Sequence, residues 1–79
     1  MIESLSPQAK SIKIGRYEHF KGKQYRVLGV GRHSESLEEL VIYQALYGEH
    51  DFWIRPLNMF LEEAEVDGKK VPRFKYIGE

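Results

Sequence analysis

The sequence predicts a mainly β fold, a small curled antiparallel sheet or SH3-like barrel of five to six short strands with one 3₁₀ turn. Three observations favour this fold class. The chain has 79 residues, which is enough for one domain. β-Branched and aromatic residues gather in short alternating runs, and glycine, proline and aspartate separate these runs at short intervals. Such strands bury one face around a single core when the sheet curls.

The first two strands are expected on either side of the turn Lys21-Gly22-Lys23. Residues 15–20 alternate in polarity, and residues 24–33 are rich in strand formers. Gly29 and Gly31 mark a position for a bulge or a sharp bend in the second strand.

The segment before Gly48 fits two structures. Ser36 and Glu39 form a capping box, which favours a helix. The run 40–43 is β-branched and aromatic, however, and a helix here would be apolar almost all round. We therefore expect a strand over 38–47, joined to the preceding strand by a long hairpin loop.

The C-terminal third is expected to hold short elements separated by turn residues. Pro56 ends one strand because it offers no amide to a ladder. Asp67-Gly68 predicts a hairpin turn, and Pro72 places the last strand at an edge or at its own start. In order, the elements are a strand over 52–55, a single 3₁₀ turn over 57–60, an extended run over 61–66 and a strand over 69–77.

Residues 1–14 are predicted to be a flexible N-terminal leader rather than core, and residues 15–79 a single β-barrel-like domain. The apolar residues of the leader are loosely spaced, Pro7 interrupts them, and terminal segments fray unless they dock. Ser6 and Pro7 are nevertheless suited to start a short helical turn, with Ser6 as its N-cap.

Several different short motifs follow one another along the chain. They are Gly15-Arg16-Tyr17-Glu18-His19-Phe20-Lys21-Gly22, Tyr25-Arg26-Val27-Leu28-Gly29-Val30, Arg32-His33-Ser34-Glu35, Leu46-Tyr47-Gly48, Trp53-Ile54-Arg55-Pro56-Leu57 with Met59-Phe60, and Val71-Pro72-Arg73-Phe74. This set resembles the bacterial domain-of-unknown-function family 1653 over about residues 15–77. The resemblance implies a compact β-rich domain in the bacterial cytoplasm, and it brings no established catalytic or binding residues with it.

The charges are balanced overall but unevenly placed. Residues 10–32 hold seven basic residues and one acidic residue, whereas residues 33–67 hold nine acidic residues and one basic residue. This pattern favours either a basic patch that follows phosphates or pairing between a basic strand and an acidic neighbour. 

The absence of cysteine excludes disulfides, thiolate catalysis and cysteine zinc sites. No two histidines stand at the spacing of a local metal motif, so we expect no metal and no cofactor. No apolar run approaches the roughly 20 residues that span a bilayer, and we expect a cytoplasmic protein without membrane association.

Arg55 is the only basic residue of the long acidic stretch, and it follows Trp53 in an apolar run. One interpretation is a bond to Glu39 or Glu62 that locks the sheet, because an unpaired buried cation is costly. The other is a guanidinium presented to the carboxylate or phosphate of a ligand, with Trp53 or Tyr43 stacking nearby.

The pair His33-Ser34 places a base beside a nucleophile, but neighbouring residues on a strand point to opposite faces. We therefore expect no nucleophilic catalysis. The simpler interpretation is that Ser34 and Ser36 shape the hairpin loop through bonds to the backbone.

The function we expect is a non-enzymatic binding module that uses a basic-aromatic surface to bind RNA or a protein segment; the residues do not separate these two partners. Tyr17 and Tyr25, which belong to this surface, would also suit a simple cap over the barrel. The alternative class is a small enzyme or nucleotide-binding protein with a shallow pocket around His33, Trp53 and Arg55. A third possibility is a dimer in which the apolar leader docks on a partner chain. The candidate ligand-binding residues are Tyr17, Phe20, Lys23, Tyr25, Arg26, His33, Trp53 and Arg55.

Overall fold

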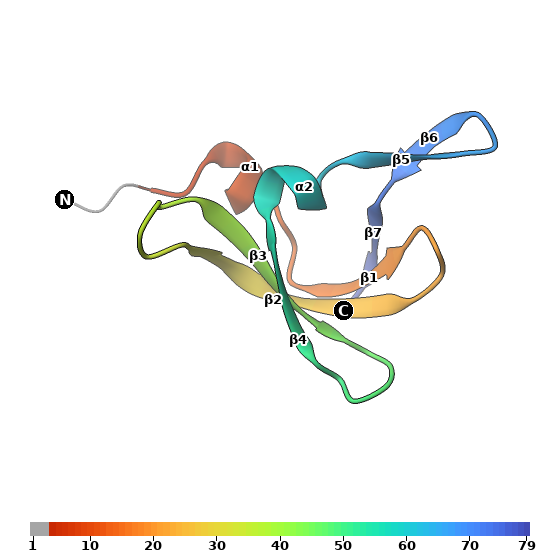
Figure 1. Ribbon diagram of the computed structural model, residues 1–79, viewed down its shortest axis with the longest axis horizontal. Helices are drawn as coiled ribbons and strands as arrows, with labels where there is room; N and C mark the ends of the chain where they lie inside the picture. Colours follow the sequence, from red (N-terminus) through yellow and green to blue (C-terminus); the bar gives the residue numbers. More distant parts are fainter. Residues whose placement is uncertain (1–3) are drawn as a thin grey trace.

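In the computed structural model, which describes residues 4–79, five strands form one antiparallel sheet and two more form a separate hairpin. The sheet strands are β1 (Gly15–His19), β2 (Gln24–Arg32), β3 (Glu39–Ala45), β4 (Phe52–Pro56) and β7 (Phe74–Gly78), the hairpin is β5 (Glu63–Val66) with β6 (Lys69–Pro72), and the helical turns are α1 (Pro7–Lys10) and α2 (Leu57–Phe60). The strand order in the sheet is β4-β3-β2-β1-β7. Figure 1 shows the sheet curling beneath α1 and α2, with the hairpin projecting from one end.

The predicted fold class, a mainly β curled antiparallel sheet, is confirmed. The sheet stays open, because β4 and β7 are its two ends and do not pair with each other within residues 4–79. The molecule is therefore a curled sheet and not a closed barrel.

The choice of a strand over the helical alternative at residues 38–47 is confirmed, because β3 pairs along its length with β2 on one side and β4 on the other. The predicted bulge is also present. The register of β2 against β3 shifts between Val27 and Gly29, so that Leu28 is the extra residue. A bulge bends its strand and increases the twist, and this one lies where the sheet curls.

The predicted single strand over 69–77 is wrong, because the chain changes partners at Arg73. The backbone N–H of Arg73 donates to the carbonyl of Glu62 at 3.1 Å and closes the β5–β6 hairpin. The carbonyl of Arg73 accepts instead from the N–H of Phe20, at 2.9 Å, beside the main sheet. Pro72 is at a position of the hairpin where the nitrogen points away from β5, so its missing N–H costs that ladder no bond. Because the chain leaves β5 after Arg73, the described residues form seven strands rather than five or six.

The helical turn expected over 57–60 is present at those residues, but it is a turn of α-helix rather than of 3₁₀-helix. The N–H of Leu61 donates to the carbonyl of Leu57 at 3.0 Å, four residues back. Leu57 and Phe60 lie three residues apart, on one side of the turn, and both are buried. No helix in the described part of the chain is long and apolar enough to cross a membrane.

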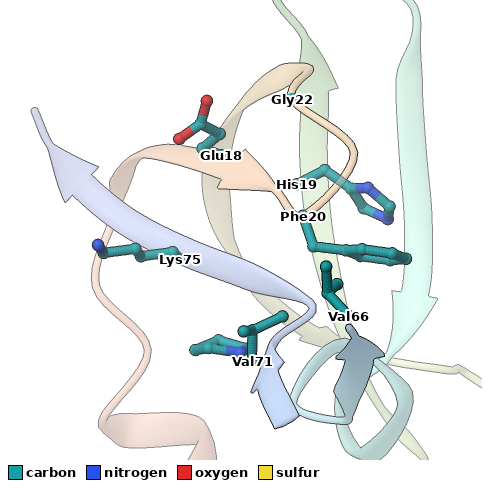
Figure 2. Close-up of a pocket in the computed structure, with 8 residues that line it drawn as sticks. Glu18, His19, Phe20, Gly22, Val66, Val71 and Lys75 are labelled. Atoms are coloured by element: carbon teal, nitrogen blue, oxygen red, sulfur yellow. The ribbon is translucent and has the colours of Figure 1, made fainter. Parts of the chain in front are cut away.

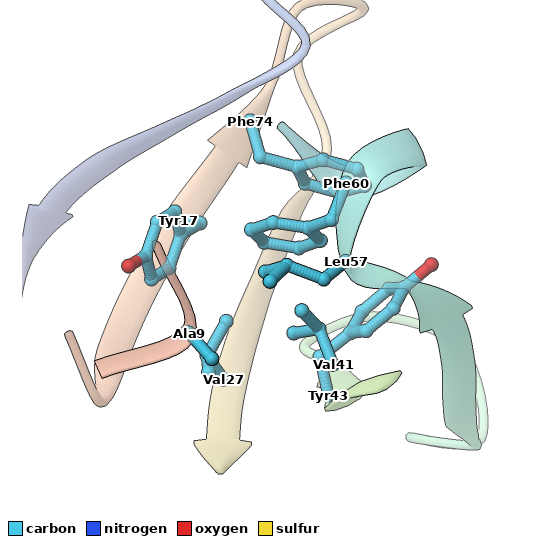
Figure 3. Close-up of a cluster of buried hydrophobic side chains, with 8 residues drawn as sticks. All are labelled: Ala9, Tyr17, Val27, Val41, Tyr43, Leu57, Phe60 and Phe74. Atoms are coloured by element: carbon cyan, nitrogen blue, oxygen red, sulfur yellow. The ribbon is translucent and has the colours of Figure 1, made fainter. Parts of the chain in front are cut away.

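The core lies between the inner face of the sheet and the two helical turns (Figure 3). Phe60 and Phe74 stack with their ring centroids 4.3 Å apart, and Tyr17 and Tyr43 meet Phe60 edge-on. The buried residues of this cluster are Ala9, Tyr17, Val27, Val41, Tyr43, Leu57, Phe60 and Phe74.

The predicted leader contributes to this core, which corrects the expectation that all of it stays outside. Ala9 is buried, and Leu5 and Ile12 pack against the cluster. The predicted helical turn with Ser6 as its N-cap is confirmed, since the side chain of Ser6 accepts from the N–H of Ala9 at 3.1 Å. Residues 1–3 of the leader lie outside the described residues, and its expected flexibility stays a prediction.

Glu39 anchors the N-terminal segment to β3. The N–H and hydroxyl of Ser6 both donate to the Glu39 carboxylate, at 2.7 and 2.6 Å. These two bonds lower the pKa of Glu39. Glu39 is therefore occupied by the N-terminal segment.

Candidate functional site

The alternation of the strands divides the predicted site residues between two faces. Tyr25 and Val27 on β2 face the core, so Arg26 between them points to the outer face. Arg26 lies opposite Arg16 on β1 and Gln44 on β3 in the sheet register. The structure therefore separates Arg26 from the aromatic residues with which it was grouped.

Tyr17, another predicted ligand contact, lies in the core. Its hydroxyl donates to the carbonyl of Lys13 at 2.8 Å and accepts from the N–H of the same residue at 3.1 Å. Burial raises the pKa of Tyr17. The ring thus fastens the segment before β1 to the core and is not available to a ligand.

Tyr25 is half-buried at the margin of the core and is paired with Tyr47. The two hydroxyls are 2.5 Å apart, and the rings meet edge-on with centroids 5.4 Å apart. Burial and the bond to Tyr47 raise the pKa of Tyr25 to about 12. The ammonium of Lys23 lies over the Tyr47 ring, 4.5 Å from its centroid. This end of the inner face therefore carries two hydrogen-bonded phenols, with a lysine over one of them.

Arg55 reaches from β4 onto the inner face. Its Nε donates to the hydroxyl of Tyr43 at 3.3 Å, and its guanidinium lies 5.8 Å from the centroid of Phe74. No carboxylate of residues 4–79 lies within ion-pair distance of it. The predicted bond to Glu39 or Glu62 is wrong, because Glu39 binds Ser6 and Glu62 binds another arginine.

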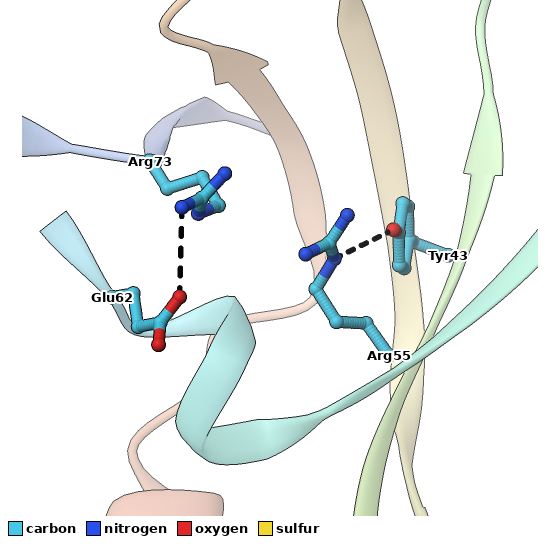
Figure 4. A network of polar contacts seen from close by, with 4 residues as sticks. All are labelled: Tyr43, Arg55, Glu62 and Arg73. Atoms are coloured by element: carbon cyan, nitrogen blue, oxygen red, sulfur yellow. Dashed lines mark hydrogen bonds and ion pairs between the residues drawn. The ribbon is translucent and has the colours of Figure 1, made fainter. Parts of the chain in front are cut away.

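That second arginine is Arg73, at the point where the hairpin meets β7. It pairs with Glu62 at 3.5 Å and lies over the ring of Phe20, 5.9 Å from the centroid. Its Nε is buried and donates to no atom of the described residues. Figure 4 shows the guanidinium groups of Arg73 and Arg55 on the same side of α2, with Glu62 beside one and Tyr43 beside the other.

His19 lies between these cations and the rings. Its imidazole meets the ring of Phe74 edge-on, with centroids 4.9 Å apart, and lies against the ring of Phe20, with centroids 4.6 Å apart. Burial lowers the pKa of His19, and the positive charges of Arg73, Lys21 and Arg55 lower it further. His19 is therefore a partly buried imidazole with three basic side chains near it.

Trp53 presents the most accessible ring of this face. It lies opposite Tyr43 in the register, on the inner side of β4, and is 50% exposed. Its indole makes no ring contact with the described residues, and an exposed π face is suited to stacking. We call the set the aromatic-basic surface: it consists of His19, Phe20, Lys23, Tyr25, Tyr47, Trp53, Arg55 and Arg73.

His33 is not part of this surface. It lies in the β2–β3 turn, where its Nδ1 accepts from the N–H groups of Glu35 and Ser36 at 3.1 and 3.3 Å. Trp53 is opposite Tyr43 and Arg32 is opposite Glu39, four residues away along β3. At about 3.3 Å per residue this places His33 at least about 13 Å along the strand from Trp53. 

The serine of the same turn has a structural role, as one interpretation expected. The side chain of Ser36 accepts from the N–H of Glu38 at 3.2 Å, and the carbonyl of His33 accepts from the N–H of Leu37 at 2.8 Å. The histidine and the serine shape the turn, and His33 is separated along the strand from Trp53 and Arg55.

A pocket of about 450 Å³ lies on the other side of Phe20, between the β1 end and the β5–β6 hairpin. Figure 2 shows the rings of His19 and Phe20 side by side, with Val66 below Phe20 and with Glu18 and Lys75 at the opposite side. Apolar side chains of the hairpin, Val66 and Val71, form part of its lining. The ring of Phe20 therefore contacts both the apolar pocket and Arg73, the residue that precedes β7.

Sequence reasoning missed three members of the surface: Tyr47, Arg73 and His19. The alternation already placed Tyr47 on the face of Tyr43, so the pattern contained the information needed to find it. Arg73 was missed because the sequence predicted one continuous strand over residues 69–77. His19 was considered only as a metal ligand, and its neighbours come from β7 and β4, far along the chain.

These features define a small curled β domain with a cationic, aromatic inner surface. A family model described as a protein of unknown function (DUF1653) matches residues 15–76, and the chain belongs to this family. The resemblance noted from the sequence motifs is thereby confirmed. A crystal structure of a protein belonging to DUF1653 from Bordetella bronchiseptica is similar, with a TM-score of 0.82 and 32% sequence identity over 89% of this chain and 92% of that chain. Comparison with curated proteins gives no match.

Proposed function

We propose that the domain is a non-enzymatic binding module and that its aromatic-basic surface binds single-stranded RNA. The observation that carries the proposal is the state of Arg55. Its guanidinium is held by Tyr43 and Phe74 on the inner face, and no carboxylate of the described chain neutralises it. A fixed, unpaired guanidinium beside an exposed indole is suited to a phosphate and the base attached to it.

The charges around Arg55 support an anionic ligand. Arg73 lies on the same side of α2 and leaves its buried Nε unused, while Lys23 lies over Tyr47 at the other end. Glu62 is the one carboxylate that pairs with a cation of this surface in the described residues, and the contact is long, at 3.5 Å. The cluster is thus locally cationic although the whole chain is neutral.

The rings support a nucleic acid over an acidic peptide. Trp53 offers an exposed face, and Phe20 and Tyr47 already accept cations on theirs. Base–aromatic stacking contributes about 1–3 kcal/mol per base and tolerates any sequence. An acidic peptide would use the arginines but would leave the indole without a planar partner.

The test uses the fluorescence of Trp53, which is the sole tryptophan of the chain. Titration with a short oligouridine should quench it. If Arg55 and Arg73 each neutralise one phosphate, the logarithm of affinity should fall with the logarithm of salt with a slope of about −1.4, or about 25-fold for a tenfold rise in salt. An Arg55→Ala variant should bind more weakly and show a slope nearer zero.

The matched control is Arg26→Ala, which removes the same side chain from the outer face of the sheet. It should leave binding unchanged. The RNA proposal fails if no quenching occurs at low salt, or if the two substitutions weaken binding equally. Quenching by an acidic peptide but not by oligouridine would assign the surface to a protein segment instead.

The setting of this function is part of the proposal. We propose that the curled sheet is related to SH3-like barrels. A helical turn before the C-terminal strands, as in those barrels, supports this. We also propose that the protein works in the bacterial cytoplasm; the absence of cysteine and the bacterial source of the similar crystal structure support this.

A further inference from the structure

β4 is an edge strand with an unusual composition. It ends the sheet order, and Figure 1 places it at the opposite end from β7. Phe52 and Ile54 point to the outer face and are 67% and 63% exposed. Natural edge strands are usually protected by charges, bulges or a covering segment, and an apolar one is a template for another strand. This edge therefore has the character of an interface.

The backbone shows which N–H and C=O groups of β4 are available to pair with another strand. The carbonyl of Asp51 accepts from the N–H of Ala45 on β3, at 2.9 Å. Successive residues of an antiparallel strand direct their hydrogen-bonding groups to alternate sides, so Trp53 and Arg55 also point to β3, while Phe52 and Ile54 point away from the sheet. Pro56 belongs to the outward set, where its missing N–H costs β3 no bond.

We propose that the β4 edge pairs antiparallel with the β4 edge of a second copy of this chain, with Trp53 on the two-fold axis. In this register Phe52 lies opposite Ile54 of the second copy. Both are outward-pointing residues, so the N–H and C=O groups of both find partners across the axis. Their side chains meet on the outer face, where an aromatic and a β-branched residue form a favourable cross-strand pair.

The charges fit a second copy of the same strand. The register places Asp51 of one copy opposite Arg55 of the other, on the inner side. Asp51 has no basic partner among the described residues, and Arg55 has no acidic one. A shift of the register by two residues would keep the backbone bonds but move Asp51 away from Arg55, so these two charges favour the register with Trp53 on the axis.

This inference goes beyond the RNA-binding proposal and shares Arg55 and Trp53 with it, so Asp51 of the second copy and a phosphate would compete for the same guanidinium. The pairing uses the outward edge of β4, whereas the ring of Trp53 and the guanidinium of Arg55 stay on the inner face. The two proposals are also measured separately, one by the mass of the particle and the other by oligonucleotide binding.

Sedimentation equilibrium of the full chain tests the proposal. The monomer has a mass of 9.3 kDa. Because one strand pair makes a small interface, we expect the average mass to approach twice this value between about 10 µM and about 1 mM protein. Ile54→Lys should keep the protein monomeric over this range. The matched control is Ile14→Lys, at a residue of equal exposure (62%) outside the sheet, which should dimerise normally.

The chain has no cysteine, so single cysteines can report the register. Opposed residues in a non-hydrogen-bonded pair have Cα atoms about 4.5 Å apart, within disulfide range. Trp53→Cys should therefore form a disulfide-linked dimer under mild oxidation at least about tenfold faster than Phe52→Cys, whose sulfur would lie opposite Ile54. 

The proposal is wrong if the wild-type chain stays monomeric at about 1 mM, which would leave the edge for a different protein. It is also wrong if Ile54→Lys still dimerises, which would assign the contact to another surface such as the N-terminal segment. Equal crosslinking at positions 52 and 53 would overturn the register. Circular dichroism of each variant confirms that the sheet is intact.

Discussion

Replacing Phe60 with alanine tests whether the inner face depends on the helical turn α2. Phe60 is 2% exposed and stacks on Phe74. Phe74 in turn lies beneath Arg55 and beside His19. Loss of the Phe60 ring should therefore destabilise the fold and loosen the rings that support the proposed site.

The expected cost follows from the surroundings of the ring. Truncation of a fully buried phenylalanine costs about 3–5 kcal/mol, because the transfer free energy is lost and a cavity remains. Edge-on or stacked contacts add about 0.5–1.5 kcal/mol per pair, and Phe60 makes such contacts with Phe74, Tyr17 and Tyr43. At 0.05–0.15 kcal/mol per residue the whole domain is stable by only about 4–12 kcal/mol. We therefore expect Phe60→Ala to cost an amount in the upper half of the range of about 3–5 kcal/mol.

Urea unfolding followed by circular dichroism measures this cost. Phe60→Ala should lose at least about 3 kcal/mol, and with a urea slope of about 1 kcal/mol/M its midpoint should fall by about 3 M or more. Met59→Ala, at the neighbouring residue that is 42% exposed, should lose less than about 1 kcal/mol. If the alanine variant is unfolded without urea, Phe60→Leu, which keeps most of the volume, should fold and lose about 1–2 kcal/mol. A loss below about 1 kcal/mol for Phe60→Ala would refute the view that α2 is held by its aromatic contacts.

Two further predictions concern the ionisation of a tyrosine and the fit of a glycine. The raised pKa of Tyr25, to about 12, means that the folded protein holds this proton after the unfolded chain has lost it near pH 10; stability should therefore be complete below pH 10 and fall as the pH rises from 10 to 12. In urea titrations at pH 9 and pH 11, Tyr25→Phe should lose less stability over this interval than the wild type, and an equal loss would contradict the assignment. Gly15 has a φ of +144°, and a Cβ there would lie 2.9 Å from the carbonyl oxygen of Gly78. Gly15→Ala should therefore cost about 1–3 kcal/mol and lower the Tm by roughly 5–20 °C, whereas Gly29→Ala, where a Cβ meets nothing within 4 Å, should change the Tm little.

Local patterns predicted the order of the elements up to the last strand, which divides into β6 and β7. Alternation puts Val41 and Tyr43 on the same face of β3, and both are in the core. Gly29 marked the bulge in β2, and the spacing of turn residues located the hairpins. These features depend on the backbone preferences of neighbouring residues, which a sequence displays directly.

Contacts between distant segments could not be predicted in the same way. One of the two interpretations of Arg55 was a bond to Glu39 or Glu62, but Glu39 is held by Ser6, which lies in the segment expected to remain outside the core. The change of partner at Arg73 depends on Phe20, which lies more than 50 residues earlier in the chain and bonds the Arg73 carbonyl. The face of a side chain was predictable from its strand, whereas the choice of partner depended on which competing group arrived from elsewhere.

The β5–β6 hairpin is a self-contained insert in the path of the chain. Its strands pair with each other and not with the main sheet, and the bond from the N–H of Arg73 to the carbonyl of Glu62 closes its base. Val66, Val71 and Pro72 of the hairpin line the pocket beside Phe20, whereas the turn residues Asp67 and Gly68 do not. The tip at Asp67 and Gly68 is therefore a natural attachment point for a peptide tag or a spectroscopic label, and loop length can vary there among relatives without a change in the register of any strand in the main sheet.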